Sequence, residues 1–394
     1  MSEIAFEPKV LKWARVASFG PKIEVLKTKL PKSSDVSSEE ILSWEEGLTK
    51  PTFAEIRALS GLYKRPLAVF FLSEPPEEDV TLPDFRTHGS QTNGDVTPET
   101  RLAIRKAKKI QEYASTLYLE TGHENKFKFK KYQTTDSPAT VASYIRSQLD
   151  VEIKKQFSNI TYEDFFEHLR TKIESTGVIT LKSGLQDSFP TEDCRAFSLT
   201  DKQPFVILIN NKDTEGGKNF SLMHEFAHVL LRKSGICNDF GDTNTNHIDP
   251  TEVFCNQFAG SFLVPDSELS THRLLVNNRK IDITEFDNFV NQIAKDFKVG
   301  RMVILRRLKD IKIVSNRLYS EKTEAWLNET IPPRKGGGRF SLTTVVKKNG
   351  MEYSRLVIDA YNKKKISRSE ISGYLGVKTK HLTKLEKMIS KHAR

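Results

Sequence analysis

The stretch Asn219–Leu231, NFSLMHEFAHVLL, places two histidines four residues apart, with a glutamate directly after the first. In an α-helix, side chains at positions i and i+4 lie one above the other on one face. His224 and His228 can therefore offer two imidazole ligands to one tetrahedral metal ion. Glu225 is rotated aside by one residue and could hold a water molecule beside that ion. The spacing predicts a metal site on a helix over residues 219–232.

These residue types suit the hydrolysis of a peptide bond. A bound zinc ion lowers the pKa of its water toward about 7, and a nearby carboxylate can accept the proton as the water attacks a carbonyl. The pattern His-Glu-x-x-His is the one that zinc peptidases use for this chemistry. The apolar residues around it indicate a buried helix, in which polar groups need partners. A helix whose histidines merely reach the surface is the alternative.

A third metal ligand has to come from another segment, because Leu231 and Ser234 occupy the glycine and third-histidine positions of the extended motif. The leading candidate is Glu252, in the first turn of a helix predicted over residues 250–263. Asn256, one turn further on, could orient a ligand. Without a metal, Glu252 would serve in a capping box at the start of this helix. The other possible ligands are His247, Asp249, Asp242 and Cys255.

Substrate binding is suggested by PFVILIN, residues 204–210, which is predicted to form a strand shortly before the helix with the two histidines. Zinc peptidases often hold an extended peptide at a sheet edge, so this strand could bind substrate by strand addition. A plain core strand is the alternative. The side chains that could stabilise an oxyanion are His247, His272 and Arg301, and the sequence does not choose between them.

The predicted fold class is α+β and mostly helical. Helical patterns cover residues 97–122, much of 138–176 and much of 281–310. Only GVITLK, CRAFSL and PFVILIN have the pattern of short strands. We therefore expect a small sheet beside the His-Glu-x-x-His helix, in a zincin-like metallopeptidase core.

The composition is that of an ordinary globular protein, with 394 residues, 37% hydrophobic and 28% charged. The sequence has no run of about 18 apolar residues, so no transmembrane helix and no membrane partner are expected. Its first residues lack the apolar segment of a signal peptide. The three cysteines include no Cys-x-x-Cys pair, which favours a reduced, cytoplasmic protein over a disulfide scaffold.

The net charge of +10 is unevenly distributed. Residues 301–394 contain 23 lysines and arginines against 8 acidic residues, a formal charge of +15, which leaves −5 for residues 1–300. A basic region of this kind could contact nucleic acid or an acidic protein face. Within it, SRSEISGYLGVKTKHLTKLEKMI has the rhythm of a helix-turn-helix. A solvated, lysine-rich surface packed on the peptidase core is the alternative.

The central segment resembles the ImmA/IrrE family of metallopeptidases. The residues that carry the resemblance are KNFSLMHEFAHVLL, EVFCNQFAGSFLVP and the upstream CRAFSLTDKQPFVILIN, within about 194–265. The resemblance implies that His224, His228 and Glu252 bind zinc, as in a gluzincin, and that Glu225 is the catalytic base. Members of the family are regulatory proteases that commonly cut a Cro-type repressor. A repressor of the Xre/Cro type, or an antitoxin, is therefore the implied protein substrate.

The N-terminal segment LSWEEGLTKPTFAEIRALSGLYKRPLAVFFL resembles the end of an Xre/Cro-type helix-turn-helix domain, and LPDFR resembles the connector that follows it. The matching residues are Trp44, Glu45, Gly47, Pro51 and Thr52. The segment in the place of the recognition helix presents Glu39 and Glu40, whereas DNA readers present cations and amides. Residues 1–75 carry a formal charge of only +1. The domain could therefore bind a protein partner instead of DNA.

These observations together predict five parts of the chain. They are a helix-turn-helix domain (1–75), a connector (76–96), a metallopeptidase domain (97–330), a linker (331–340) and a basic C-terminal helical segment (341–394). The leading hypothesis is a cytoplasmic zinc endopeptidase that cleaves a regulatory protein. One alternative is a non-catalytic, DNA- or protein-binding transcriptional regulator with structural zinc, although structural sites usually close all four positions with protein ligands. A toxin or phage-defence protease is another alternative.

Overall fold

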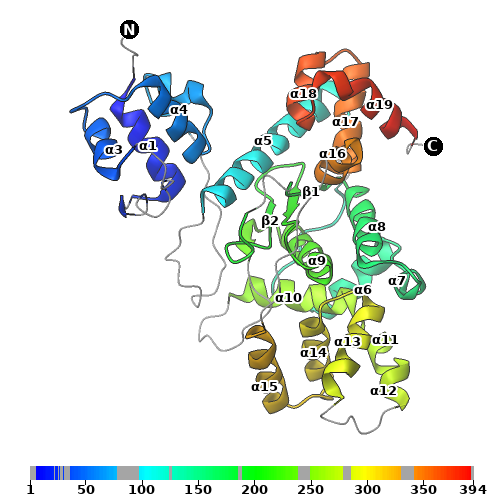
Figure 1. Ribbon diagram of the computed structural model, residues 1–394. Helices are drawn as coiled ribbons and strands as arrows, with labels where there is room; N and C mark the ends of the chain where they lie inside the picture. The colour runs from blue at the N-terminus through cyan, green and yellow to red at the C-terminus, as the bar shows by residue number, and fades with distance from the viewer. Residues whose placement is uncertain are drawn as a thin grey trace. The chain divides into compact units, whose positions relative to one another are not determined.

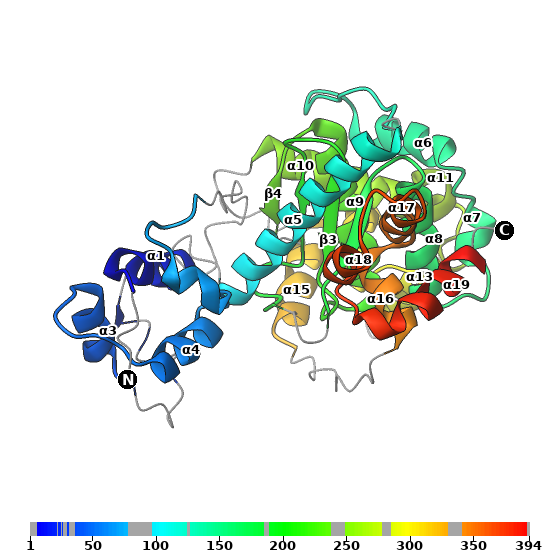
Figure 2. The same cartoon turned by 90° about the horizontal axis from the view of Figure 1, so that it is seen from above.

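The computed structural model describes residues 6–21, 23, 24, 26, 30, 36–77, 97–123, 127–184, 189–237, 249–277, 285–329 and 341–391. It is mostly helical with one small sheet, which confirms the predicted α+β class (Figures 1 and 2). The chain forms two compact units. The first comprises Met1–Thr81 and Gln91–Lys106, and the second comprises Leu82–Ser90 and Ala107–Arg394. The basic C-terminal segment therefore belongs to the second unit.

The first unit is a small helical bundle. Its elements are α1 (Pro8–Phe19), α3 (Ser38–Glu45), α4 (Phe53–Leu62), the 3-10 turn η1 (Leu67–Phe71) and the first residues of α5 (Pro98–Thr121). Its apolar core is formed by Leu11, Ala14, Phe19, Leu26, Val36, Ile41, Trp44, Ile56, Leu59, Tyr63 and Phe70. In the segment GPKIEVLKTKL, which the sequence also predicts to be helical, five of the eleven residues lie outside the described residues.

A buried ion pair joins α1 to α3 in this bundle. Arg15 donates from Nε and Nη2 to the two carboxylate oxygens of Glu45, at 2.7 and 2.8 Å. Glu45, one of the residues matched to the helix-turn-helix pattern, thus has a structural role. On the exposed side of α3, Glu40 closes a capping box with Ser37. The exposed side of the first turn of α3 therefore carries the acidic side chains of Glu39 and Glu40.

The sheet of the second unit contains three predicted strands and one that was not predicted. Its order is β1 (Ile179–Lys182), β3 (Val206–Ile209), β2 (Ala196–Leu199) and β4 (Gly235–Cys237). β3 pairs in parallel with β1 and antiparallel with β2, and β4 pairs antiparallel with the other side of β2. The strand at PFVILIN is thus an inner strand, and the prediction that it could accept a peptide at a sheet edge is wrong.

The helix with the two histidines, α9 (Glu215–Leu231), is buried from Gly216 to its end. It begins four residues earlier than predicted, because Thr214 Oγ1 accepts the amide of Gly217 at 3.0 Å and caps the first turn. Gly216 in this first turn serves close packing. A Cβ on Gly216 would lie 2.7 Å from the backbone of Val299 and Gly300.

The remaining helices of the second unit surround α9 and the sheet. α10 (Pro250–Leu263) packs along α9 and against α6 (Pro138–Gln148), and α8 (Tyr162–Glu174) packs on α9 and β1. The other helices of this part are α7 (Ile153–Phe157), α11 (Asp266–Ser270), α12 (Arg273–Asn277), α13 (Phe286–Phe297), α14 (Arg301–Asp310) and α15 (Asn316–Leu327). None of the described helices is both long and apolar enough to cross a membrane.

The basic C-terminal segment is helical and packs on the core of the second unit. It contains α16 (Leu342–Asn349), α17 (Met351–Asn362), α18 (Arg368–Leu375), the 3-10 turn η2 (Thr379–His381) and α19 (Leu382–Lys391). α16 contacts β1, and α17 contacts α8. In Figure 1 these helices lie at one end of the second unit and α11–α15 at the other. The predicted linker over 331–340 lies outside the described residues.

Two buried charged residues of α8 hold the C-terminal segment in place. Arg170 donates to the carbonyl oxygen of Lys347 at 2.6 Å. Glu174 accepts the amide of Met351 at 3.1 Å, at the N-terminus of α17, and also pairs with Arg170 at 3.1 Å. Burial raises the pKa of Glu174 to about 7, although Arg170 and the helix amides favour its charged form. Gly350, with φ of +82°, turns the chain directly against this pair.

We expect Gly350→Ala to destabilise the second unit by roughly 3 kcal/mol or more, because the new Cβ would combine backbone strain with overpacking. It would lie 2.2 Å from Glu174 Oε1 and 2.9 Å from the carbonyl oxygen of Thr180. Gly376→Ala is the matched control, since Gly376 has φ of +63° but open space around it. That variant should lose only about 1 kcal/mol. Urea denaturation measures both, and equal losses would contradict this account.

Glu174 should make stability depend on pH. Its folded-state pKa of about 7 lies above the usual 4.5, so the folded chain binds the extra proton between these values. The free energy of unfolding should therefore fall as pH rises from about 4.5 to 7, by roughly 3 kcal/mol from this group. In Glu174→Gln the corresponding slope should be absent. Urea titrations of both proteins across this range measure the difference, and parallel pH profiles would refute the assignment.

Candidate metal centre

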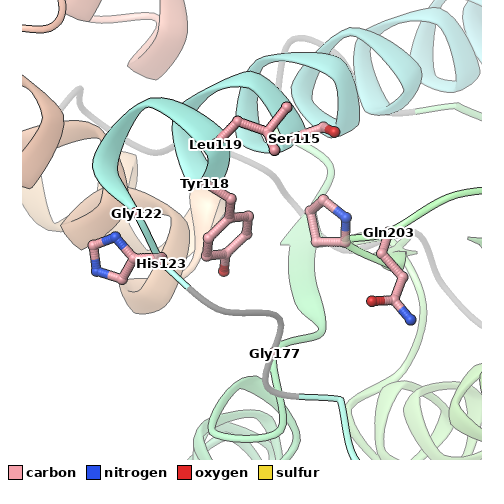
Figure 3. Close-up of a pocket in the computed structure, with 8 residues that line it drawn as sticks. Ser115, Tyr118, Leu119, Gly122, His123, Gly177 and Gln203 are labelled. Carbon is pink, nitrogen blue, oxygen red and sulfur yellow. The ribbon is translucent and has the colours of Figure 1, made fainter.

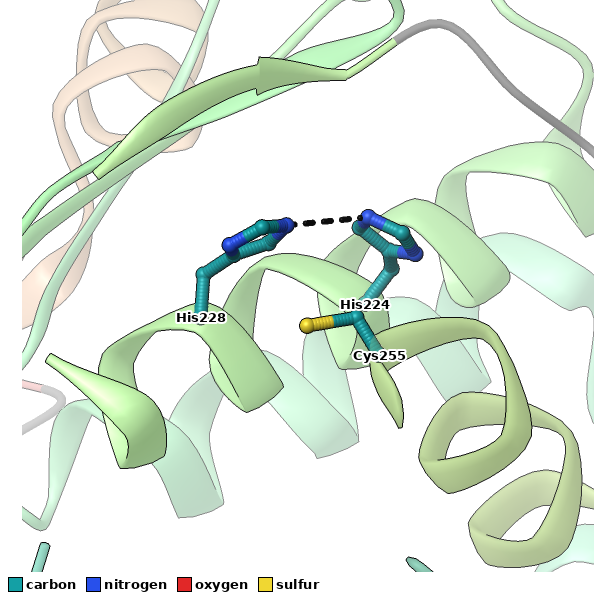
Figure 4. A group of neighbouring side chains, drawn as sticks. All are labelled: His224, His228 and Cys255. Carbon is teal, nitrogen blue, oxygen red and sulfur yellow. Dashed lines mark hydrogen bonds between the residues drawn. The ribbon is translucent and has the colours of Figure 1, made fainter. Parts of the chain in front are cut away.

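The two histidines of α9 point their Nε2 atoms at one another, 3.2 Å apart (Figure 4). Each Nδ1 faces an oxygen acceptor. His224 Nδ1 lies 2.9 Å from Oδ1 of Asn256, and His228 Nδ1 lies 3.2 Å from the carbonyl oxygen of Lys233. Because these oxygens accept a proton from Nδ1, the lone pair of each neutral ring is on Nε2. Both rings are thereby oriented to bind one ion between them.

Glu252 completes a triangle with the two imidazoles. Its Oε2 lies 3.2 Å from His224 Nε2 and its Oε1 lies 3.1 Å from His228 Nε2. A tetrahedral zinc ion with bonds of about 2.0–2.1 Å keeps its ligand atoms about 3.3 Å apart. The three side chains therefore fit such an ion. Glu252 is not used as a cap, because Asp249 caps α10 by accepting the amide of Thr251 at 2.6 Å.

Cys255 also lies close to the histidines. The candidate ligand atoms of His224, His228 and Cys255 all lie within 4.8 Å of one another (Figure 4). Burial raises the pKa of the Cys255 thiol well above its usual value, and the charges of Glu252 and Glu225 raise it further. A neutral thiol is a poor metal ligand. The carboxylate of Glu252 suits this role better than the thiol, because its oxygens lie 3.1–3.2 Å from the two Nε2 atoms and its pKa is lowered, which favours the negative charge. Two other predicted candidates, His247 and Asp242, lie outside the described residues.

Glu225 is fully buried, and neither of its carboxylate oxygens has a hydrogen bond of ordinary geometry among the described residues. Burial raises the pKa of Glu225, whereas His228, His224 and the nearby Ser198 hydroxyl favour its ionised form. A carboxylate buried without a partner is costly, and such groups are usually kept for a ligand or water. Together with the triangle of ligand atoms, this buried carboxylate without a hydrogen bond fits a site for a metal ion and its water.

The electrostatics of the triangle also suit a cation. Burial works against the protonated imidazole, but the carboxylate of Glu252 outweighs it and raises the pKa of His224. Burial likewise works against the charged carboxylate, but the two imidazoles lower the pKa of Glu252 well below its usual range. A metal ion would compete with protons for these ligands. Metal affinity should therefore rise with pH.

Two contributors to the site were not predicted. The carbonyl of Lys233 orients His228, and Ser198 lies beside Glu225. A backbone carbonyl leaves no signature in a sequence, and Ser198 comes near Glu225 through the tertiary contact between β2 and α9. Of the three suggested oxyanion residues, His247 lies outside the described residues and the other two are engaged elsewhere. His272 pairs with Asp296 at 3.2 Å, and Arg301 pairs with Glu329 at 2.6 Å.

A separate groove of about 390 Å³ lies at the end of α5 (Figure 3). It is lined by Ser115, Tyr118, Leu119, Gly122, His123, Gly177, Gln203 and Pro204. Burial raises the pKa of Tyr118 to about 12, so this phenol is neutral at ordinary pH. None of the lining residues belongs to α9 or α10. The groove is therefore not part of the candidate metal centre.

The segment that contains this candidate metal centre matches a known family of proteins. Residues 185–309 match the family model Peptidase_M78, described as the IrrE N-terminal-like domain. The matched segment contains β2, α9, β4 and α10, and so the entire candidate metal centre. It supports the resemblance to the ImmA/IrrE family and indicates a peptidase of the metal-dependent kind. The first unit lies outside the match. No curated protein and no solved structure matches the chain.

Zinc titrations of single variants can separate the two candidate third ligands. We expect Glu252→Gln to weaken zinc binding at least 100-fold, because the charged ligand is lost. Cys255→Ser should change the dissociation constant by no more than about threefold. Asn256→Ala should cost about 10- to 100-fold through the loss of ring orientation. Competition with a chromophoric chelator measures all three, and a larger loss in Cys255→Ser than in Glu252→Gln would make the cysteine the ligand.

Proposed function

We propose that this chain is a zinc-dependent endopeptidase that cleaves a regulatory protein. The observation that carries the proposal is the triangle of His224, His228 and Glu252, with edges of 3.1–3.2 Å, beside the buried and unpartnered carboxylate of Glu225. The match to a peptidase family over the same residues supports it. In this proposal the first three side chains hold the zinc ion and Glu225 is the catalytic base.

When bound, the zinc ion would supply a low-pKa water and polarise the scissile carbonyl. The protein residues have distinct tasks. Asn256 and the carbonyl of Lys233 keep the imidazole rings in the tautomer that binds through Nε2. Glu225 accepts the proton of the attacking water and passes it to the leaving amine nitrogen. Its burial supports this exchange, because a raised pKa lets the same carboxyl group both take and return a proton.

The substrate peptide would bind along β4. This strand pairs with β2 on one side, and no described strand pairs with its other side. β4 begins two residues after Lys233, whose carbonyl holds His228, so it runs from the metal centre itself. An extended peptide that adds to this edge would pass the proposed zinc ion. β1, at the opposite edge, is in contact with α16.

The proposed substrate is an Xre/Cro-type repressor or an antitoxin. This class follows from the resemblance to the ImmA/IrrE family, whose members act on such proteins. The acidic exposed side of α3 supports protein binding by the first unit better than DNA binding, since phosphate contacts need cations. The first unit would then bring the substrate to the peptidase. A toxin or phage-defence protease would use the same chemistry on a different target.

A non-catalytic regulator with structural zinc is the second candidate function. A structural site is usually closed by four protein ligands and has no need of a buried base. Cys255 could supply the fourth ligand in that case. The orphaned Glu225 favours the catalytic function. Chelation separates the two, because a structural site predicts unfolding of the second unit and a catalytic site predicts lost cleavage with the fold retained.

Glu225→Gln should abolish cleavage while retaining zinc, because the amide cannot accept a proton. We expect the turnover to fall at least 1,000-fold, within the range ascribed to positioned acid–base groups together with water orientation. Glu215→Gln, at the start of the same helix, is the matched control and should keep full activity. The measurement is a proteomic comparison of cells expressing the three forms. Fragments that accumulate equally with wild type and Glu225→Gln would refute the mechanism.

A further inference from the structure

The last helices of the chain form a small bundle with a tight turn. α18 ends at Leu375 and is followed by Gly376, which adopts the left-handed conformation at φ of 63° and ψ of 36°. After Val377 and Lys378 the chain forms η2 and continues directly into α19. Ser372 Oγ donates to the carbonyl oxygen of Val377 at 2.6 Å and fixes the turn. This connection, a short turn with glycine between two helices, is that of a helix-turn-helix.

The bundle has its own apolar core, which includes α17. The buried side chains are Tyr353, Leu356, Val357, Ala360, Ile366, Ile371, Leu375, Val377, Leu382, Leu385 and Ile389. Asn349 adds a hydrogen bond from Nδ2 to the carbonyl oxygen of Leu375 at 2.9 Å. α19 contacts α17, and α18 contacts both α17 and η2. The second helix of the motif is thus held by one face and leaves the other face to solvent (Figure 2).

The solvent face of α19 carries a stripe of lysines. Lys384 and Lys387 are three residues apart on α19, and Lys380 precedes them by one turn. All three side chains are exposed, as is Lys378 in the turn. Among the residues that the structure describes, none of these four lysines forms an ion pair. Residues 363–391 hold 9 lysines and arginines against 2 acidic residues.

We propose that this stripe, defined as Lys380, Lys384 and Lys387, binds double-stranded DNA with α19 as the helix that enters the major groove. Each unpaired lysine can replace a condensed counterion on a phosphate. α19 has ten residues and is therefore about 15 Å long, and the major groove is about 12 Å wide and admits one helix. The turn at Gly376 presents the start of this helix, as in helix-turn-helix proteins.

The first unit provides the contrast that assigns the DNA contact to this end of the chain. Its α3 exposes Glu39 and Glu40, whereas α19 exposes Lys384 and Lys387. Residues 1–75 carry a formal charge of only +1. The region that resembles an Xre/Cro-type domain in sequence thus has almost no net positive charge to attract phosphates. The C-terminal bundle has both the cations and the geometry.

The test uses the full-length protein and a fluorescein-labelled duplex of mixed sequence, with anisotropy measured over a range of salt concentrations. The variant is Lys380→Gln, Lys384→Gln and Lys387→Gln combined. Its slope of log affinity against log salt should be less steep by about 2.7, since each lost phosphate contact removes about 0.9. Affinity at low salt should fall at least tenfold. Thermal unfolding should be unchanged, because the three side chains are exposed.

The matched control removes the same charge from α7 and α13 by Lys154→Gln, Lys155→Gln and Lys295→Gln, all exposed positions. It should bind the duplex as the wild type does. Equal losses in both triple variants would reduce the effect to net charge and overturn the proposal. No binding by the wild type, or tighter binding to single-stranded RNA than to the duplex, would overturn it as well. The result is independent of peptidase activity.

Discussion

The packing of the second unit has to accommodate a buried helix, α9, that carries ionisable side chains in its interior. His224, Glu225 and His228 are all at most 3% exposed. Charged or polar groups in such a place are tolerated only when they are paired or bind an ion. α10 supplies Glu252 and Asn256, and the chain after α9 supplies the carbonyl of Lys233. The elements around α9 therefore supply polar partners for its ionisable residues in addition to apolar packing.

The other end of α9 shows how its position is fixed. Gly216 lies against the backbone at Val299 and Gly300, where no side chain would fit. Asn219 Nδ2 donates to the carbonyl oxygen of Lys298 at 2.7 Å. These contacts tie the first turn of α9 to the segment between α13 and α14. A helix held at its start by close backbone contact can hold ligands near its end in a constant geometry, which catalysis requires.

The sequence predicted local features well and three-dimensional relations less well. The i, i+4 spacing of the histidines and the bounds of α10 follow from helix periodicity and from the prolines that flank it. The inner position of β3 could not be read from PFVILIN, because an inner and an edge strand can share one apolar pattern. β4 is only three residues long. It pairs with β2 because the chain comes back to the sheet after α9, and this tertiary relation is not visible in the sequence. The start of α9 was missed because close packing of Gly216 is a tertiary contact.

The buried pair of Arg170 and Glu174 links the part of the second unit that holds the proposed zinc site to the part that holds the proposed DNA-binding stripe. It joins α8, which packs on α9, to the start of α17, which begins the C-terminal bundle. The proposed DNA-binding stripe and the proposed zinc site therefore belong to one unit, with a buried ion pair in the path between them. A protease held on DNA through such a unit would meet DNA-bound regulatory proteins at high effective concentration. Selectivity for the proposed regulatory substrate would then arise from shared location as well as from the sequence at the cleavage site.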